Sequence, residues 1–149
     1  MQHLLKNVAI EHINAPIGAA SSTDDDSAAV DTQGYEGVLF IIPITDSVAT
    51  GVATLTIKQC DTSGGTYAAL SGAVAAATCA VNDDLNEHVL VVDVYKPRER
   101  YLKSNLVSAT ANIAFGDSIA IKYGARKAPI TQATAEVAAS TMVASPAEA

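Results

Sequence analysis

The residues of this chain that could do chemistry are its histidines, its cysteines and a few adjacent acids. Catalysis needs a nucleophile or an acid/base pair held within hydrogen-bond reach. His3 lies near the N-terminus, whereas His12 and His88 fall in predicted strands, where each is expected to be a surface or hydrogen-bonded residue. The sequence has no G-x-S-x-G, H-E-x-x-H or P-loop motif. We therefore expect no enzyme, no catalytic residue and no cofactor.

Metal binding is the other chemistry to weigh. Asp24, Asp25 and Asp26 are adjacent, but a calcium site usually takes spaced ligands and a turn glycine. Residues 19–26 instead have the composition of an exposed loop. Cys60 and Cys79 are the only cysteines, too few and too far apart for a zinc site, and we expect reduced thiols. The sequence therefore predicts no metal site.

Charge is distributed unevenly along the chain. The net charge of −7 argues against nucleic-acid binding, which depends on Lys and Arg neutralising phosphates. Residues 1–95 carry two basic and twelve acidic side chains, whereas residues 96–127 carry seven basic and two acidic ones. Such a basic strip on an acidic body can orient the chain against an acidic protein surface or a neighbouring copy. Alternatively, it is a solvated strand edge whose charges prevent aggregation.

If the strip binds a partner, its charged side chains supply hydrogen-bond donors and nearby tyrosines supply anchors. Otherwise these are exposed strand residues and core tyrosines. The expected interface residues are Lys96, Arg98, Arg100, Tyr101, Lys103, Lys122, Tyr123, Arg126, Lys127 and Pro129.

Short apolar or alternating segments separated by turns must position these residues. Residues 38–42 form a continuous apolar run, which suits a strand buried on both sides. Further strands are predicted at 54–59, 88–95, 101–107 and 118–123; residues 3–14 favour a strand over a short helix, and 68–80 a strand or irregular structure. With no convincing amphipathic helix, the fold class is all-β: an antiparallel β-sandwich or a jelly-roll-like barrel.

The C-terminal part of the sequence has a different composition. Residues 128–149 contain few large apolar side chains and no periodic apolar face. We expect a sandwich domain over residues 1–127 and an extended or flexible arm over 128–149, either a loose terminus or an arm laid across a neighbouring subunit.

Neither a secretory signal nor an apolar run approaching the roughly 20 residues of a membrane span is evident. We expect synthesis in the host cytoplasm and no membrane association.

Several short motifs in the second half of the chain carry a family resemblance. They are Lys96-Pro97, Arg100-Tyr101-Leu102, Ala111-Asn112, the stretch from Ile121 to Gln132, and Ser145-Pro146-Ala147-Glu148. In these the chain resembles small capsid decoration (cement) or minor capsid proteins of tailed bacteriophages, best from about Val89 to the C-terminus.

This resemblance implies a structural virion protein on the capsid exterior that stabilises contacts between major capsid subunits. The implied partners are the major capsid protein and further copies of the chain, as a dimer or trimer. A carbohydrate- or cell-surface-binding virion module is the alternative, although five tyrosines and no tryptophan make a poor aromatic platform. A small β-fold enzyme or metal protein is a second alternative, but the sequence lacks the set of catalytic or metal-binding residues that it would need.

Overall fold

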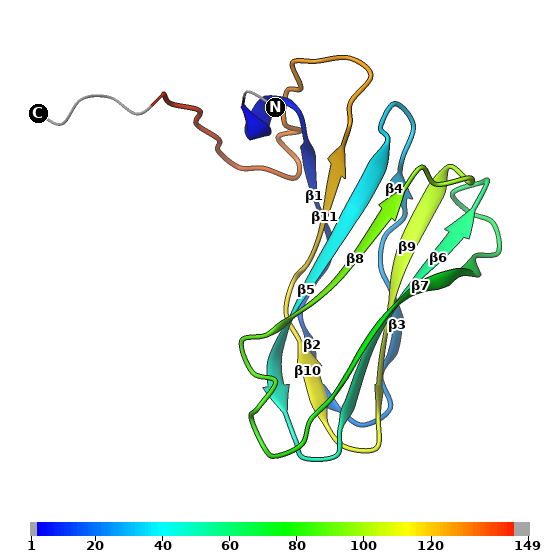
Figure 1. Ribbon diagram of the computed structural model, residues 1–149, viewed down its shortest axis with the longest axis vertical. Helices are drawn as coiled ribbons and strands as arrows, with labels where there is room; N and C mark the ends of the chain where they lie inside the picture. Colours follow the sequence, from blue (N-terminus) through cyan, green and yellow to red (C-terminus); the bar gives the residue numbers. More distant parts are fainter. Residues whose placement is uncertain (1–2, 145–149) are drawn as a thin grey trace, which may run out of the picture.

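Two antiparallel β-sheets pack face to face in the computed structural model, which describes residues 3–144 (Figure 1). The predicted all-β sandwich is therefore confirmed. A short 3-10 helix, η1 (Leu4–Lys6), precedes the first strand. Within the described residues, no helix is long and apolar enough to cross a membrane.

The first sheet has six strands and contains the longest buried strand of the molecule. Its order is β1 (Ala9–Asn14), β11 (Ser118–Tyr123), β5 (Gly37–Ser47), β10 (Ile113–Phe115) and β2 (Ile17–Ala20), and β8 (Val89–Tyr95) pairs with the other side of β5.

The second sheet has five strands. Its order is β3 (Asp24–Asp26), β9 (Tyr101–Ala109), β6 (Val52–Cys60) and β7 (Ala68–Thr78), and β4 (Val30–Asp31) also pairs with β9.

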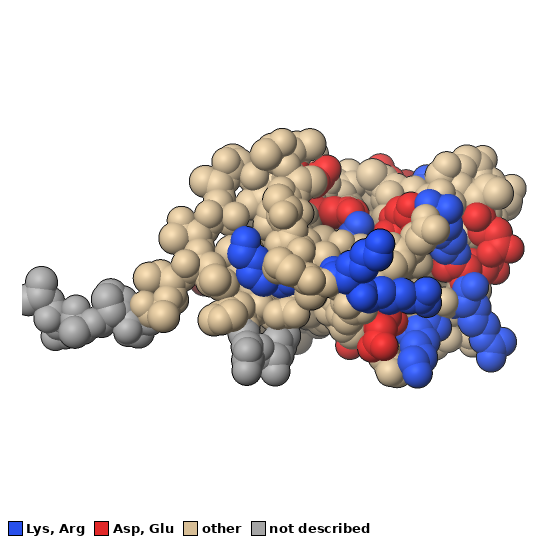
Figure 2. All heavy atoms as spheres, turned by 90° about the horizontal axis from the view of Figure 1, so that it is seen from above, with Lys and Arg blue, Asp and Glu red and all other residues tan. Residues whose placement is uncertain are grey.

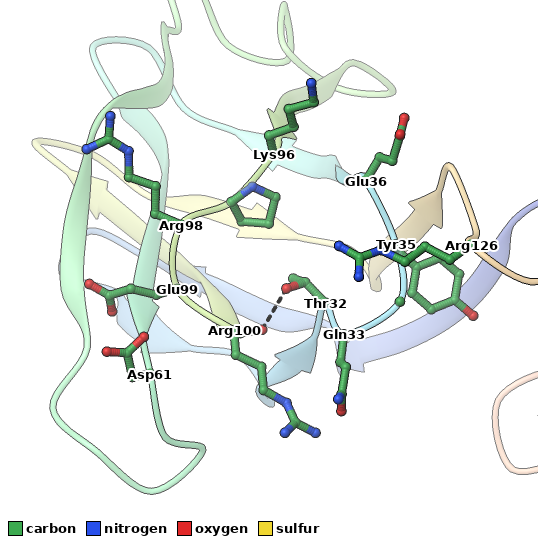
Figure 3. Close-up of a pocket in the computed structure, with 12 residues that line it drawn as sticks. Thr32, Gln33, Tyr35, Glu36, Asp61, Lys96, Arg98, Glu99, Arg100 and Arg126 are labelled. Atoms are coloured by element: carbon green, nitrogen blue, oxygen red, sulfur yellow. Dashed lines mark hydrogen bonds between the residues drawn. The ribbon is translucent and has the colours of Figure 1, made fainter.

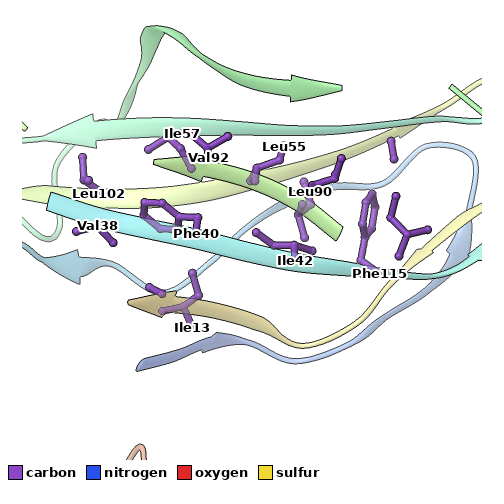
Figure 4. Close-up of a cluster of buried hydrophobic side chains, with 14 of the residues drawn as sticks. Ile13, Val38, Phe40, Ile42, Leu55, Ile57, Leu90, Val92, Leu102 and Phe115 are labelled. Carbon is purple, nitrogen blue, oxygen red and sulfur yellow. The ribbon is translucent and has the colours of Figure 1, made fainter. Parts of the chain in front are cut away.

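Strand β5 supplies the centre of the core. Its even-numbered side chains, including Phe40 and Ile42, point between the sheets and meet Leu55 and Ile57 of β6 (Figure 4). The odd-numbered side chains in the first half of β5, such as Leu39, lie on the outer face of the sheet and are only partly buried. The apolar run at 38–42 is thus covered on one side by the sandwich, and its other side faces outward.

The predicted loop at residues 19–26 is wrong, because this segment contributes β2 and β3. All three aspartates of β3 pair with β9 despite their charge. The Asn105 amide donates to Asp24 at 2.7 Å and to Asp26 at 2.8 Å, and Lys58 Nζ lies 2.7 Å from Asp26. The strand forms because β9 and β6 supply partners for Asp24 and Asp26, and Asn14 of β1 donates to Asp25.

Alanine-rich residues 68–78 form a strand, as one of the two alternatives expected. Small side chains allow β7 to lie at the edge of the second sheet. The register of its pairing with β6 shifts between Thr56 and Lys58, opposite Gly72. Gly72 has a φ of 81°, a left-handed backbone conformation that glycine adopts readily. The bulge interrupts an otherwise long and uncharged edge strand.

The C-terminal arm lies along the outer edge of β1. Ile130 N donates to Lys6 O at 2.7 Å. The Gln132 side chain accepts from Ile10 N at 3.1 Å and donates to two carbonyl oxygens, those of Leu5 and Val8. Glu136 accepts from His12 N at 2.9 Å. The arm thus satisfies donors that an edge strand would leave open.

Beyond Val137 the described chain is exposed and leads away from the sandwich (Figure 1). Part of the predicted arm, 145–149, and the resemblance motif at 145–148 lie outside the described residues.

Candidate protein-binding surface

One end of the sandwich gathers basic side chains from two segments that are distant in sequence. The β8–β9 loop carries Lys96, Arg98 and Arg100, and the chain after β11 carries Arg126 and Lys127. These five residues define what we call the basic end. Figure 2, which looks onto this end, shows Lys and Arg side chains clustered with acidic ones beside them.

Backbone hydrogen bonds tie both segments to the connection between β4 and β5. Lys96 N donates to Glu36 O at 2.7 Å, and Arg126 N donates to Gly34 O at 2.9 Å. Thr32 reaches the β8–β9 loop as well, because its side-chain hydroxyl donates to Arg100 O at 2.8 Å. The β4–β5 connection, residues 32–36, is therefore the platform on which the basic loops lie.

Two adjacent hollows lie in this end. The larger has a volume of about 490 Å³ and the smaller about 380 Å³, and they share Gln33, Gly34, Tyr35 and Arg126. Figure 3 shows Lys96 and Arg98 projecting around the larger hollow, with Arg126 beside the Tyr35 ring. Both hollows are open depressions whose rims are charged.

Arg100 has its charge paired within the molecule. Its Nε lies 2.9 Å from one carboxylate oxygen of Asp31, and its Nη2 lies 2.7 Å from the other. This pair of hydrogen bonds lowers the pKa of Asp31 and raises the pKa of Arg100. Arg100 therefore fixes the loop and has little charge left for a partner.

Lys96, Arg98 and Arg126, in contrast to Arg100, form no ion pair within the part of the chain that the structure describes. Lys96 Nζ lies 5.1 Å from the centre of the Tyr95 ring, which is itself exposed. These cations are available to carboxylates of another molecule.

Acidic side chains alternate with these cations around the larger hollow. Glu36, Asp61 and Glu99 line it together with Lys96, Arg98, Arg100 and Arg126. Such mixed charge suits a folded protein surface, where partners exchange ion pairs, better than a polyanion, which favours a uniformly positive surface.

Two of the expected interface residues lie elsewhere. Lys122 points between the sheets, is 9% exposed, and forms an ion pair with Glu11. Lys103 lies on the second sheet, where its Nζ is 4.6 Å from the centre of the Tyr67 ring. The strip seen in the sequence is therefore divided, because strand alternation sends neighbouring cations to different faces.

The two tyrosines and the proline of the expected set are also separated. Tyr101 lies beneath Arg100, with the guanidinium 5.1 Å from the ring centre. Tyr123 is on the outer face of the first sheet, where its hydroxyl donates to Asp93 at 2.7 Å. Pro129 is exposed in the arm, three residues after Arg126.

Tyr35 is the residue at this site that the sequence analysis missed. Its ring lines both hollows and lies 4.8 Å from Lys122 Nζ. In the sequence, Gly34 and Gly37 near this tyrosine indicate only a turn. The tyrosine between them was the available clue, since a tyrosine in a turn places an aromatic ring at the surface.

The candidate chemical groups are not brought together into a reactive set. His12 Nε2 lies 2.7 Å from Asp117, and His88 Nδ1 lies 3.1 Å from the carbonyl oxygen of Asn86. Within the part of the chain that the structure describes, no three His, Cys, Asp or Glu side chains are arranged to hold a metal ion.

Comparison with protein-family models and with curated proteins found no match to the sequence. Among solved structures, the chain is similar to the crystal structure of the PBSX exported protein XepA, with a TM-score of 0.52 and 14% identity. The similarity covers 99% of this chain and 46% of the XepA chain, so this chain spans about half of that protein. This level of likeness shows a shared fold.

A second similarity is to the structure of the infectious bursal disease virus Gx strain. It has a TM-score of 0.43 and 8% identity over 78% of this chain and 31% of the other. A TM-score below 0.5 does not show a shared fold.

Proposed function

We propose that this chain is a structural protein of a tailed-phage virion that binds the outer surface of the capsid and stabilises contacts between major capsid subunits. The basic end is the contacting surface, and the partner is an acidic patch of the major capsid protein. The observation that carries the proposal is the clustering of Lys96, Arg98, Arg126 and Lys127 at one end of a chain with a net charge of −7.

This charge arrangement favours one orientation of approach. Repulsion keeps the acidic body away from an acidic surface, whereas the basic end is attracted to it, so association is steered. A protein that binds only the assembled shell stabilises that shell by its binding free energy, and many copies add many increments.

Two further points support a virion role. The motifs of the second half of the chain resemble decoration proteins of tailed phages, and several of them fall in the basic end. The fold is shared with XepA, an exported protein of phage PBSX.

Cosedimentation with capsids that lack this protein tests the proposal. We expect saturable binding and a higher melting temperature of the capsid. Arg98→Gln combined with Arg126→Gln should weaken binding at least tenfold, because two unpaired cations are removed from the contact.

Lys103→Gln is the control. It removes a cation from the outer face of the second sheet, away from the basic end, and should change the capsid affinity by no more than about twofold. If the unaltered chain does not bind capsids at all, the capsid proposal fails, and a glycan array then tests the carbohydrate-binding alternative. Equal weakening by the control and the double variant would show that the basic end is not the contact.

A further inference from the structure

The outer face of the first sheet is apolar where β1, β11, β5 and β8 run side by side. Alternation places the following residues on this face, which we call the apolar face: Ile10, Leu39, Ile41, Pro43, Val89, Val91, Ile119, Ile121, with Tyr95 and Tyr123 at one end. An antiparallel sheet that meets water usually carries polar side chains there. This face therefore needs an explanation.

The pairing register makes the apolar face continuous. Ile119 of β11 lies opposite Ile41 of β5, and Ile41 lies opposite Val91 of β8. One step along, Ile10 of β1 pairs with Ile121, and Ile121 pairs with Leu39. Two adjacent rows of large apolar side chains thus each span three strands, and His12 on β1 and Asp93 on β8 stand at the fourth positions of the two rows.

Exposure is greatest on β8. Val89 is 53% exposed, Val91 44% and Tyr95 59%, although all three are large hydrophobic or aromatic residues. These side chains lose contact with water only if another molecule covers them.

The outer face of the second sheet is different. Along β6 it presents Thr54, Thr56 and Lys58, and beside them on β9 lies Lys103. Val74 of β7, 52% exposed, is the large aliphatic residue most exposed on that sheet. The two outer faces therefore differ in composition: the second sheet presents polar and charged side chains, whereas the first presents apolar ones.

The strands of the apolar face carry one outward carboxylate, Asp93, and one outward histidine, His12. Asp93 accepts a hydrogen bond from the Tyr123 hydroxyl, and His12 is paired with Asp117. Elsewhere the body is strongly acidic, so two copies repel each other in most orientations. Contact through the apolar face brings few charges together and buries apolar surface, which favours association.

We propose that the apolar face packs against the same face of a second copy, related by a two-fold axis. In such an isologous contact each apolar row meets its own equivalent, so the surface is self-complementary. The four strands are together about 19 Å wide and, over the length that all four share, about 20 Å long, which is a footprint of roughly 400 Å². This is about half of the roughly 800 Å² per partner of a standard interface, so we expect a small interface.

The edges of the sheet favour packing by faces. The β1 edge is occupied by the chain's own arm through Gln132 and Glu136, so another strand cannot pair there. On its other side β8 pairs with no strand of residues 3–144, although it lies beside β7, and pairing of two β8 strands is the competing way to form a dimer. A substitution remote from β8 distinguishes the two arrangements.

Sedimentation equilibrium of the purified full chain provides the test, with no capsid present. We expect a dimer whose dissociation constant rises at least tenfold in Val91→Glu, because each copy then buries a carboxylate against an apolar surface. Ile121→Lys lies two strands away from the β8 edge and should have the same effect. Val74→Glu, with nearly the same starting exposure, should leave the dimer intact.

A monomer at concentrations up to about 100 µM would overturn the proposal. So would a dimer that tolerates Ile121→Lys, because that result assigns association to the β8 edge. Far-ultraviolet circular dichroism checks that each variant is folded. The inference goes beyond capsid binding, since it assigns a different surface to a different partner: a chain that dimerises but does not bind capsids would fail only the proposed function.

Discussion

Gly37 and Tyr123 illustrate how one small residue organises the outer face of the first sheet. They are paired across β5 and β11, and the tyrosine ring lies over the glycine. From there its hydroxyl reaches Asp93 on β8, and burial and this carboxylate raise the pKa of Tyr123. The side chain thus links three strands because position 37 has no Cβ.

Replacing this glycine should therefore destabilise the sandwich. In Gly37→Ala, the new Cβ would overlap Cζ and Oη of Tyr123, so the ring must move and lose Asp93. We expect the free energy of unfolding in urea to fall by about 1–3 kcal/mol. Gly18→Ala is the control, because its Cβ would meet nothing within 4 Å; similar losses in both variants would contradict this account.

Asp31 and Arg100 give the basic end a pH-dependent contribution. Because Arg100 holds the pKa of Asp31 below its ordinary value of 3.8, the folded state binds the proton less tightly than the unfolded state. The stabilisation is present above that value and is lost as pH falls through the lower, folded value. Urea denaturation of Asp31→Asn should show a deficit relative to the unaltered chain at pH 7 that narrows toward pH 3.

A deficit that stays constant over this pH range would show that the charge of Asp31 contributes nothing. The effect is expected to be small, since both side chains are substantially exposed.

At the scale of elements, the arm acts as a cover for the β1 edge. Gln132 alone makes three hydrogen bonds with the backbone of residues 5–10. In Gln132→Ala we expect amide hydrogen exchange at Ile10 to accelerate at least tenfold, because this N–H donates to the Gln132 side chain. Trypsin should also cleave faster after Arg126 and Lys127 once the arm detaches.

Thr131→Ala changes the neighbouring exposed residue and serves as the control for this experiment. Unchanged exchange at Ile10 in Gln132→Ala would mean that the arm is not what protects β1.

At the scale of the whole molecule, the two proposed surfaces differ in physical character and should respond differently to salt. The basic end lies at one end of the sandwich, whereas the apolar face lies along one broad side. Raising NaCl from about 50 to 500 mM shortens the screening length from roughly 14 to 4 Å, so capsid binding should weaken. Dimerisation through the apolar face should be unchanged or tighter, because salt also screens repulsion between the acidic bodies.

Parallel titrations by cosedimentation and by analytical ultracentrifugation measure the two effects. If both equilibria weakened together, one surface would be serving both partners.

The sequence by itself determined the class of fold and most of the strands. Runs such as 38–42 and 54–59 have strand length and end at turn residues, so local propensity and packing agree on the same structure. The prediction failed at Asp24–Asp26, because three acids lack the apolar pattern of a strand. Their partners Asn105 and Lys58 lie far away in the chain, so only the tertiary structure shows how their charges are satisfied.

Which face each strand side chain occupies was decided by the tertiary structure alone. In β11 the isoleucines share a face, as the sequence indicates, but that face is outward, and Ala120 and Lys122 point inward. Period-two alternation gives two equivalent faces and does not say which one meets the other sheet. The same ambiguity divided the basic strip, so that Lys122 is buried while Arg126 lines the surface hollows with Tyr35. Hydrophobicity alone would have buried the apolar face, and its exposure is visible only in the folded chain.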